Sequence, residues 1–226
     1  MRFQDAAPDA RAIVYAGIQA DPLVARLSDL LAGASHDQRI LARAVMNGAS
    51  TTPSIWMAMF PSLFRPSAPN GGDVRRRSEA ILAASLEVAE RGEQVRSQVR
   101  GAVVESLTEI LVRRRPGTSS ERVRRERRIL FDGVRAEIHP YDVTVEAPGA
   151  AEALDCKWGA RGINADVLHQ LDDARIHAAD EDERLVVTIV VFDAERSCNV
   201  RLARETAPHE QTRLIALETL DRLAQP

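Results

Sequence analysis

The stretch YDVTVEAPGAAEALDCKW, residues 141–158, decides the fold because it has the pattern of two strands joined by a tight turn. Apolar and polar residues alternate over residues 141–146, which is typical of a strand with one buried face. Residues 147–150, Ala-Pro-Gly-Ala, are typical of a turn. The alternation then resumes over residues 152–158. The stretch therefore predicts a β-hairpin.

The turn determines which side chains face each other. With a turn centred on Pro148-Gly149, Asp142 lies opposite Asp155 on one face of the sheet, where cross-strand neighbours are about 5 Å apart. Lys157 is two residues further on and shares that face. Two facing carboxylates repel each other unless a positive charge lies between them, and Mg²⁺ prefers oxygen ligands. The hairpin predicts a metal site beside an ammonium group. A surface salt bridge between Lys157 and its acids is the alternative interpretation.

The sequence on either side of the hairpin predicts a mixed α/β layout. Apolar residues recur at helical spacing, with a helix start at Asp21-Pro22 and candidate breaks at Gly92 and Gly101. The expected elements are helices over 9–47, 73–114, 163–178 and 206–223, a linker over 48–72 with the apolar patch Ile55–Phe60, and strands over 129–131, 141–146, 152–158, 185–192 and 198–202. This order predicts a mixed central β-sheet flanked by helices over residues 73–226, with residues 1–72 as a helical extension and linker.

The composition is that of an ordinary globular protein, with 45% hydrophobic and 28% charged residues. No apolar run approaches the roughly 20 residues of a bilayer span, and the N-terminus lacks a secretory pattern. Cys156 and Cys198 are far apart and have no metal-type neighbours. These features predict a cytoplasmic protein that has no membrane association, disulfide framework or cysteine-based zinc site.

The charges are unevenly distributed along the chain. Residues 73–128 hold 14 basic and 9 acidic side chains, whereas residues 129–226 hold 10 basic and 19 acidic ones. A basic segment attracts phosphates and an acidic one can hold a cation; solvated arginine-rich helices are the alternative interpretation. Of the 30 basic residues 29 are arginine, so Lys157 is the only lysine, a compact charge with chemistry that arginine lacks.

Asp142, followed after a short interval by Asp155-Cys156-Lys157 at the end of a strand, and then by a helix and a buried strand, resembles the PD-(D/E)xK restriction-endonuclease-like superfamily. The resemblance covers roughly residues 95–205. It implies that Asp142 and Asp155 bind Mg²⁺, which Mn²⁺ can replace, and that Lys157 is catalytic. The main-chain carbonyl of Cys156 is an implied further ligand.

The resemblance also implies two site residues on helices. A glutamate on the preceding helix points to Glu105, with Glu109 and then Glu152 as alternatives. A glutamine on the following helix points to Gln170. The tyrosine that some branches carry four residues later is absent, because Ala174 stands there.

The implied function is that of a magnesium-dependent endonuclease that hydrolyses DNA rather than RNA, in restriction or in defence against foreign DNA. A homodimer or a subunit of a defence complex is expected, with the N-terminal helices and the Ile55–Phe60 patch as candidate contacts. The arginines expected to contact phosphates are Arg113, Arg114, Arg115, Arg124, Arg125 and Arg161.

Two other functions remain open: a catalytically decayed nuclease fold that acts as a nucleic-acid-binding or assembly subunit, and a helical interaction module in residues 1–72. The sequence has no G-x-S-x-G, Walker A, G-x-G-x-x-G or H-E-x-x-H motif, which argues against acyl transfer, nucleotide hydrolysis and dinucleotide chemistry.

Overall fold

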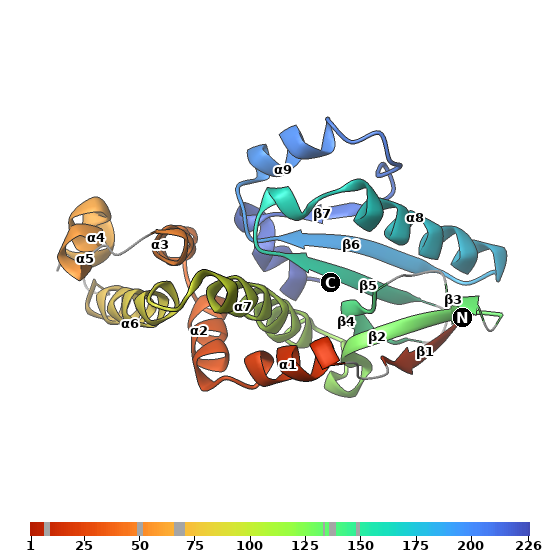
Figure 1. The fold of residues 1–226 in the computed structure, drawn as a ribbon, viewed down its shortest axis with the longest axis horizontal. Coiled ribbons are helices and arrows are strands. Elements are labelled where there is room, and N and C mark those ends of the chain that lie inside the picture. The colour runs from red at the N-terminus through yellow and green to blue at the C-terminus, as the bar shows by residue number, and fades with distance from the viewer. Residues whose placement is uncertain (7–9, 49–51, 66–70, 133, 136–138, 148–149) are drawn as a thin grey trace. The chain divides into compact units, whose positions relative to one another are not determined.

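The computed structural model describes residues 1–6, 10–48, 52–65, 71–132, 134–135, 139–147 and 150–226 (Figure 1). The chain forms two compact units. The sheet unit consists of Met1–Asp9 and Thr108–Pro226, and the helical unit consists of Ala10–Leu107. The predicted division at residue 72 thus lies inside the helical unit.

The helical unit contains α1 (Ala10–Gln19), α2 (Pro22–Ala32), α3 (His36–Asn47), α4 (Pro53–Met59), α5 (Pro61–Phe64), α6 (Gly71–Ala89) and most of α7 (Glu93–Arg113). Helix α2 begins where the sequence predicts, because Asp21 is its N-cap and accepts a hydrogen bond from the main-chain N–H of Leu23 at 2.8 Å. Gly92 separates α6 from α7, whereas Gly101 lies within α7. Because α6 packs on α2, α3 and α5, it belongs with the helices that precede it.

The predicted linker contains the two short helices α4 and α5. A proline occupies the first turn of each, where the missing N–H would have no helical partner. Trp56 is buried beside Leu41 and Val45, so core packing is confirmed for this residue. Ile55 and Met59 of the same helix remain 49% and 61% exposed.

The sheet unit is built on one mixed sheet of order β1-β2-β4-β5-β6-β7, with β3 paired to β2. Its strands are β1 (Arg2–Asp5), β2 (Val123–Phe131), β3 (Val134–Arg135), β4 (Tyr141–Val145), β5 (Ala151–Lys157), β6 (Leu185–Val191) and β7 (Arg213–Ile215). The pairs from β1 to β5 are antiparallel, and β5–β6 and β6–β7 are parallel. The predicted class, a mixed sheet with flanking helices, is confirmed.

Helix α8 (Ala165–Asp180) connects β5 to its parallel neighbour β6 and covers one face of the sheet. Leu168 and Leu171 of α8 are fully buried in a core cluster with Val187 and Ile189 of β6. Burying each such leucine contributes roughly 2 kcal/mol. Six of the seven residues of β6 are buried, as its run of apolar residues predicts.

Two predictions near the C-terminus are wrong. Residues 198–202 belong to α9 (Glu195–Leu202), a helix in which Cys198 alone is buried, so the segment has one inward face and no strand alternation. The predicted helix over 206–223 is instead β7 followed by the 3₁₀ helix η3 (Leu217–Ala224). The buried residues of η3 are Leu217, Leu220 and Leu223, and their spacing of three is the 3₁₀ repeat.

Two further observations concern the chain as a whole. Within the described ranges, no helix has both the length and the apolar composition that crossing a bilayer requires. Cys156 and Cys198 are both free and buried.

Candidate metal centre

The hairpin of β4 and β5 has the register that the sequence predicts. Its pairing runs from Val143 opposite Leu154 towards the turn. The recorded pairing ends there, so the position of Asp142 opposite Asp155 on one face of the sheet stays a prediction. Residues 148–149, the predicted centre of the turn, lie outside the described residues. The predicted register is therefore confirmed for Val143–Val145 opposite Glu152–Leu154.

Lys157 forms an ion pair with Asp155, with 2.6 Å between Nζ and Oδ2. The two side chains are 24% and 10% exposed, so solvent screens the pair only partly. Burial by itself lowers the pKa of Lys157, but the charges of Asp155 and Asp142 outweigh burial and hold that pKa above its usual value. Lys157 is thus an ammonium group in the field of two carboxylates.

The carboxylate of Asp142 is held by the main chain of the neighbouring strand. Its Oδ2 accepts a hydrogen bond from the N–H of Cys156 at 2.5 Å, just past the last main-chain pair of the hairpin. The Sγ of Cys156 lies 3.4 Å from Oγ1 of Thr108 on α7. Side chains alternate along a strand, so the Cys156 side chain points to the face opposite Asp155 and Lys157.

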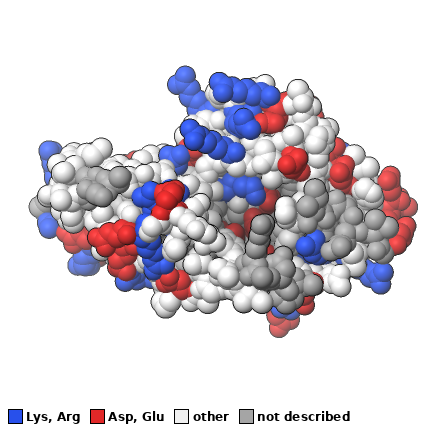
Figure 2. All heavy atoms as spheres, in the orientation of Figure 1, with Lys and Arg blue, Asp and Glu red and all other residues white. Residues whose placement is uncertain are grey.

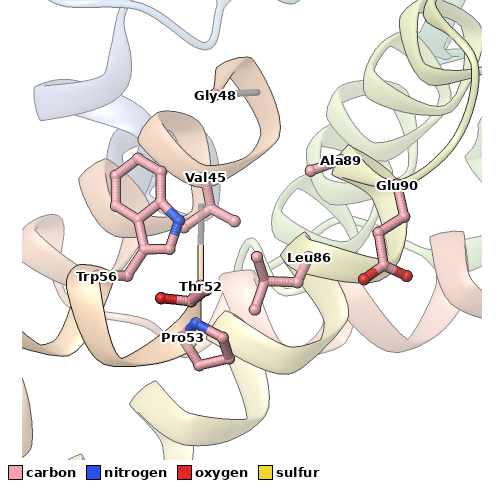
Figure 3. A pocket seen from close by; sticks show the side chains of 8 residues that line it. All are labelled: Val45, Gly48, Thr52, Pro53, Trp56, Leu86, Ala89 and Glu90. Atoms are coloured by element: carbon pink, nitrogen blue, oxygen red, sulfur yellow. The ribbon is translucent and has the colours of Figure 1, made fainter. Parts of the chain in front are cut away.

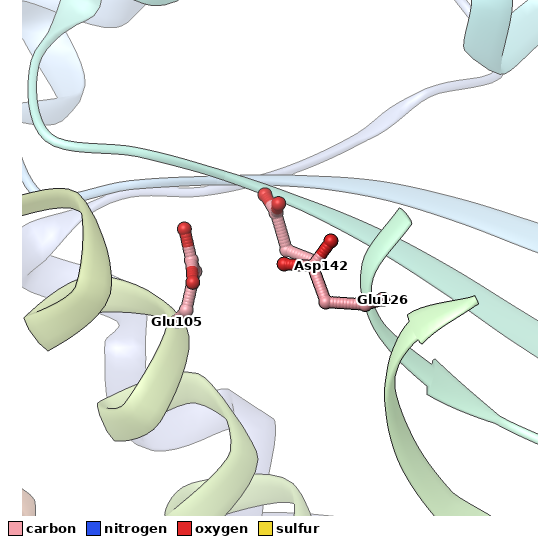
Figure 4. Close-up of side chains that lie close together, drawn as sticks. All are labelled: Glu105, Glu126 and Asp142. Atoms are coloured by element: carbon pink, nitrogen blue, oxygen red, sulfur yellow. The ribbon is translucent and has the colours of Figure 1, made fainter. Parts of the chain in front are cut away.

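A third strand contributes an acid that the sequence analysis missed, Glu126 of β2. Strands β2 and β4 pair through Arg125 with Val143 and Arg127 with Tyr141, which puts Glu126 in register with Asp142. Carboxylate oxygens of Glu126 and Asp142 lie within 4.8 Å of each other (Figure 4). The backbone of Glu126 has φ 52°, the left-handed region that costs a non-glycine residue free energy and often marks functional positions.

Glu105, the third acidic side chain drawn in Figure 4, lies on α7 one helical turn before Thr108. Within the helical unit its carboxylate accepts hydrogen bonds from the hydroxyl of Tyr15 and from Nε2 of Gln19, the latter at 2.8 Å. These two donors fix the orientation of the carboxylate. Its role as a metal ligand remains a prediction.

Gln170 on α8 is bound to the segment that enters β4. Its Nε2 donates to the carbonyl of His139 at 3.0 Å, and its Oε1 accepts from the N–H of the same residue at 3.3 Å. The hydroxyl of Tyr141 donates to the carbonyl of Gln170 at 3.3 Å. Gln170 therefore holds the backbone that leads into Asp142, an observation that favours a positioning role over the predicted catalytic one.

The two alternative acids, Glu109 and Glu152, are paired with arginines within the sheet unit. Glu109 forms ion pairs with Arg113 and Arg125, and Glu152 forms one with Arg115 at 2.9 Å. These pairs also engage three of the six arginines that were expected to contact phosphates. The other three, Arg114, Arg124 and Arg161, are exposed.

The helical unit contains a cavity of about 370 Å³, and its described lining includes none of the predicted catalytic residues (Figure 3). Val45, Trp56 and Leu86 contribute apolar walls, and Glu90 is the one titratable residue in the described lining. Among the described residues, this carboxylate has no second titratable group beside it in the lining.

No family model, curated protein or solved structure matches the chain. The candidate site therefore stands on its own geometry: Glu126 of β2 lies close to Asp142 of β4, and the ammonium group of Lys157 is paired with Asp155 of β5. Such a set can hold a divalent cation and offer a positive charge to an anionic substrate.

Proposed function

We propose that the protein is a magnesium-dependent phosphodiesterase that hydrolyses DNA at a site centred on Asp142, Asp155 and Lys157. The observation that carries the proposal is the placement of the only lysine, 2.6 Å from Asp155 and within the field of Asp142. An ion pair kept for stability alone would need neither a second acid on β4 nor a third on β2.

The residues at the site suit a divalent cation. Glu126, Asp142 and Asp155 supply hard oxygen donors, and their three negative charges exceed the single positive charge of Lys157 by two. Oδ2 of Asp155 is buried and, among the described residues, accepts no well-aligned hydrogen bond, although Nζ of Lys157 is near. When bound, Mg²⁺ would activate a water molecule and offset charge on the phosphoryl group.

The proposed roles of the protein groups follow from their contacts. Cys156 N–H keeps the carboxylate of Asp142 directed toward the end of β5. Asp155 keeps the ammonium of Lys157 beside the acids, where it can donate to a phosphate oxygen and stabilise the charge that develops in the transition state. Glu126 and Glu105 are the proposed additional metal ligands, together with the carbonyl of Cys156.

The choice of substrate rests on the family resemblance and on charge. The resemblance favours DNA over RNA, and a role in restriction or in defence against foreign DNA. Assembly as a homodimer or as a subunit of a larger complex belongs to the same proposal. The exposed Ile55 and Met59 of α4 are the proposed contacts.

The test is incubation of the full chain with plasmid, linear duplex, single-stranded DNA and RNA, each with Mg²⁺ or Mn²⁺. Lys157→Met keeps the length of the side chain and removes its charge. Arg184→Met is the matched control, because this exposed arginine adjoins the opposite end of β6. We expect metal-dependent DNA cleavage that Lys157→Met abolishes and Arg184→Met retains.

Two results would overturn the proposal. Full cleavage by Lys157→Met would remove the assigned role of the lysine. DNA binding by the wild-type chain, without turnover under either metal, would instead favour the decayed nuclease fold that acts as a binding subunit.

A further inference from the structure

Three exposed arginines lie on two neighbouring elements of the sheet unit. Arg161 is in the short 3₁₀ helix η2 (Ala160–Gly162), Arg196 is in α9, and Arg204 follows the end of α9. We term these three residues the α9 basic surface. Figure 2 shows lysine and arginine side chains gathered over α9. Arg196 and Arg204 are eight positions apart in the sequence, and α9 ends between them at Leu202.

The three arginines of the α9 basic surface differ in their ion pairing from most of the other arginines of the sheet unit that were expected to contact phosphates. In the described part of the chain, no acidic side chain forms an ion pair with Arg161, Arg196 or Arg204. By contrast, Arg201 of the same helix pairs with Glu205 at 2.7 Å. Like charges that lack counter-charges repel one another, and a polyanion relieves that repulsion when it binds.

The elements that carry the α9 basic surface are linked to Lys157 by neighbouring residues. Gly162 packs so closely on the side chain of Lys157 that an added Cβ would lie 2.8 Å from its Cδ. Arg201 Nε donates to the carbonyl of Ile163 at 2.8 Å, which ties α9 to the end of η2. The elements that carry the three arginines are therefore joined to the part of the sheet unit that holds the lysine.

A buried carboxylate at the end of β6 holds both elements in place. Oδ2 of Asp193 accepts from the N–H of Ala160 at 3.0 Å, and Oδ1 accepts from the N–H of Ala194 at 2.8 Å. Asp193 is only 9% exposed. One side chain thus fixes the start of η2 and the residue that precedes α9, so the three arginines are presented from a rigid base.

We propose that the α9 basic surface binds the phosphate backbone of the DNA next to the bond that is cleaved. Guanidinium groups suit this role because they donate two parallel hydrogen bonds to a phosphate. The inference rests on the proposed function, since it assigns the surface that brings the substrate to the site.

The test measures how DNA binding depends on salt. Fluorescence anisotropy with a labelled duplex in EDTA gives the affinity of the full chain between 50 and 200 mM salt. Each phosphate contact contributes about 0.9 to the slope of log affinity against log salt. We expect the triple variant Arg161→Gln, Arg196→Gln, Arg204→Gln to lower that slope by about 2 to 3. Arg161→Gln alone should lower it by about 1.

The matched control removes three arginines that have acidic partners in the helical unit. Its substitutions are Arg26→Gln, Arg75→Gln and Arg76→Gln, whose partners are Glu87, Glu79 and Asp73. Both triple variants lose the same charge, so a non-specific charge effect would change both slopes equally. That equal change would overturn the inference, as would an unchanged slope in the α9 variant.

A small substrate distinguishes a loss of DNA binding from a loss of catalysis. Bis(p-nitrophenyl) phosphate has one phosphodiester and no extended backbone, so the α9 triple variant should lose at least 10-fold more activity on DNA than on this substrate. Equal loss on both substrates would overturn the docking role. Failure of the proposed function looks different, because the wild-type chain would then hydrolyse neither substrate.

Discussion

Gly162→Ala tests whether catalysis depends on the position of the Lys157 side chain. An alanine Cβ would lie 2.8 Å from Cδ of Lys157 and 3.0 Å from its Cβ and Cγ. Ordinary van der Waals contact begins at 3.4 Å, so the lysine stem or η2 has to move by about 0.6 Å. The Cβ of Lys157 is fixed by β5, so the free end of the side chain takes up much of this displacement.

The expected loss of activity follows from this displacement. A shift of about 1 Å in a positioned group can cost on the order of 100-fold in rate. We therefore expect kcat/KM for DNA cleavage to fall about 10- to 100-fold. Overpacking at one position costs about 1–3 kcal/mol of stability, which leaves a protein of ordinary stability folded.

The assay is the initial rate of plasmid nicking with saturating Mg²⁺, together with a thermal melt. Gly17→Ala is the control, because an added Cβ there meets no atom within 4 Å. Wild-type nicking by Gly162→Ala would refute the reasoning.

Three other predictions concern separate parts of the molecule. Glu126→Gln should weaken Mn²⁺ binding about 10-fold by titration calorimetry, and unchanged affinity would remove Glu126 from the metal centre. A hydrogen bond from Arg91 chiefly lowers the pKa of Asp21 in the folded state, so its contribution to stability is complete above about pH 4 and is lost as the pH falls through that lowered pKa. Asp21→Ala should cost about 1 kcal/mol in urea melts at pH 7 and less at pH 3, and a pH-independent difference would contradict this explanation. Gln170→Ala removes both hydrogen bonds to His139 and should lower the cleavage rate with little change in KM for DNA, whereas a change in KM alone would argue against positioning.

The hairpin could be predicted from sequence because its determinants are local. The alternation of side chains fixes which residues face each other, and a short turn leaves little freedom in the register. The candidates Asp142, Asp155 and Lys157 are predicted from that pattern, and the structure confirms the pairing as far as Val143 opposite Leu154. The same holds for α2, whose capping residue and proline adjoin each other in the sequence.

Glu126 could not be predicted by the same reasoning because β2 lacks apolar alternation at that point. Its arginines are stabilised by partners from distant parts of the chain: Arg127 pairs with Glu146 of the segment after β4 and with Asp5 of β1. A run of arginines resembles a solvated surface until those partners are known. One signal was present, since Glu126 is the only acid within residues 122–128.

The errors near the C-terminus have a similar cause. Residues 195–202 hold only one buried side chain, so their pattern carries too little information to separate a helix from a strand. The leucines of η3 fit both an α-helix and a 3₁₀ helix at the level of spacing. Burial of all three leucines at a repeat of three distinguishes the two.

The position of β1 has a consequence for the order of events during synthesis. Asp5 leaves the ribosome 122 residues before its partner Arg127, an interval on the order of 10 s at ordinary elongation rates. The loop between them would cost about 4 kcal/mol to close in a flexible chain, and prior folding of the helical unit shortens it. Strand β1 therefore remains unpaired while the helices of the helical unit form. Its four residues, of which only Phe3 is apolar, are a poor template for pairing with another chain during that interval.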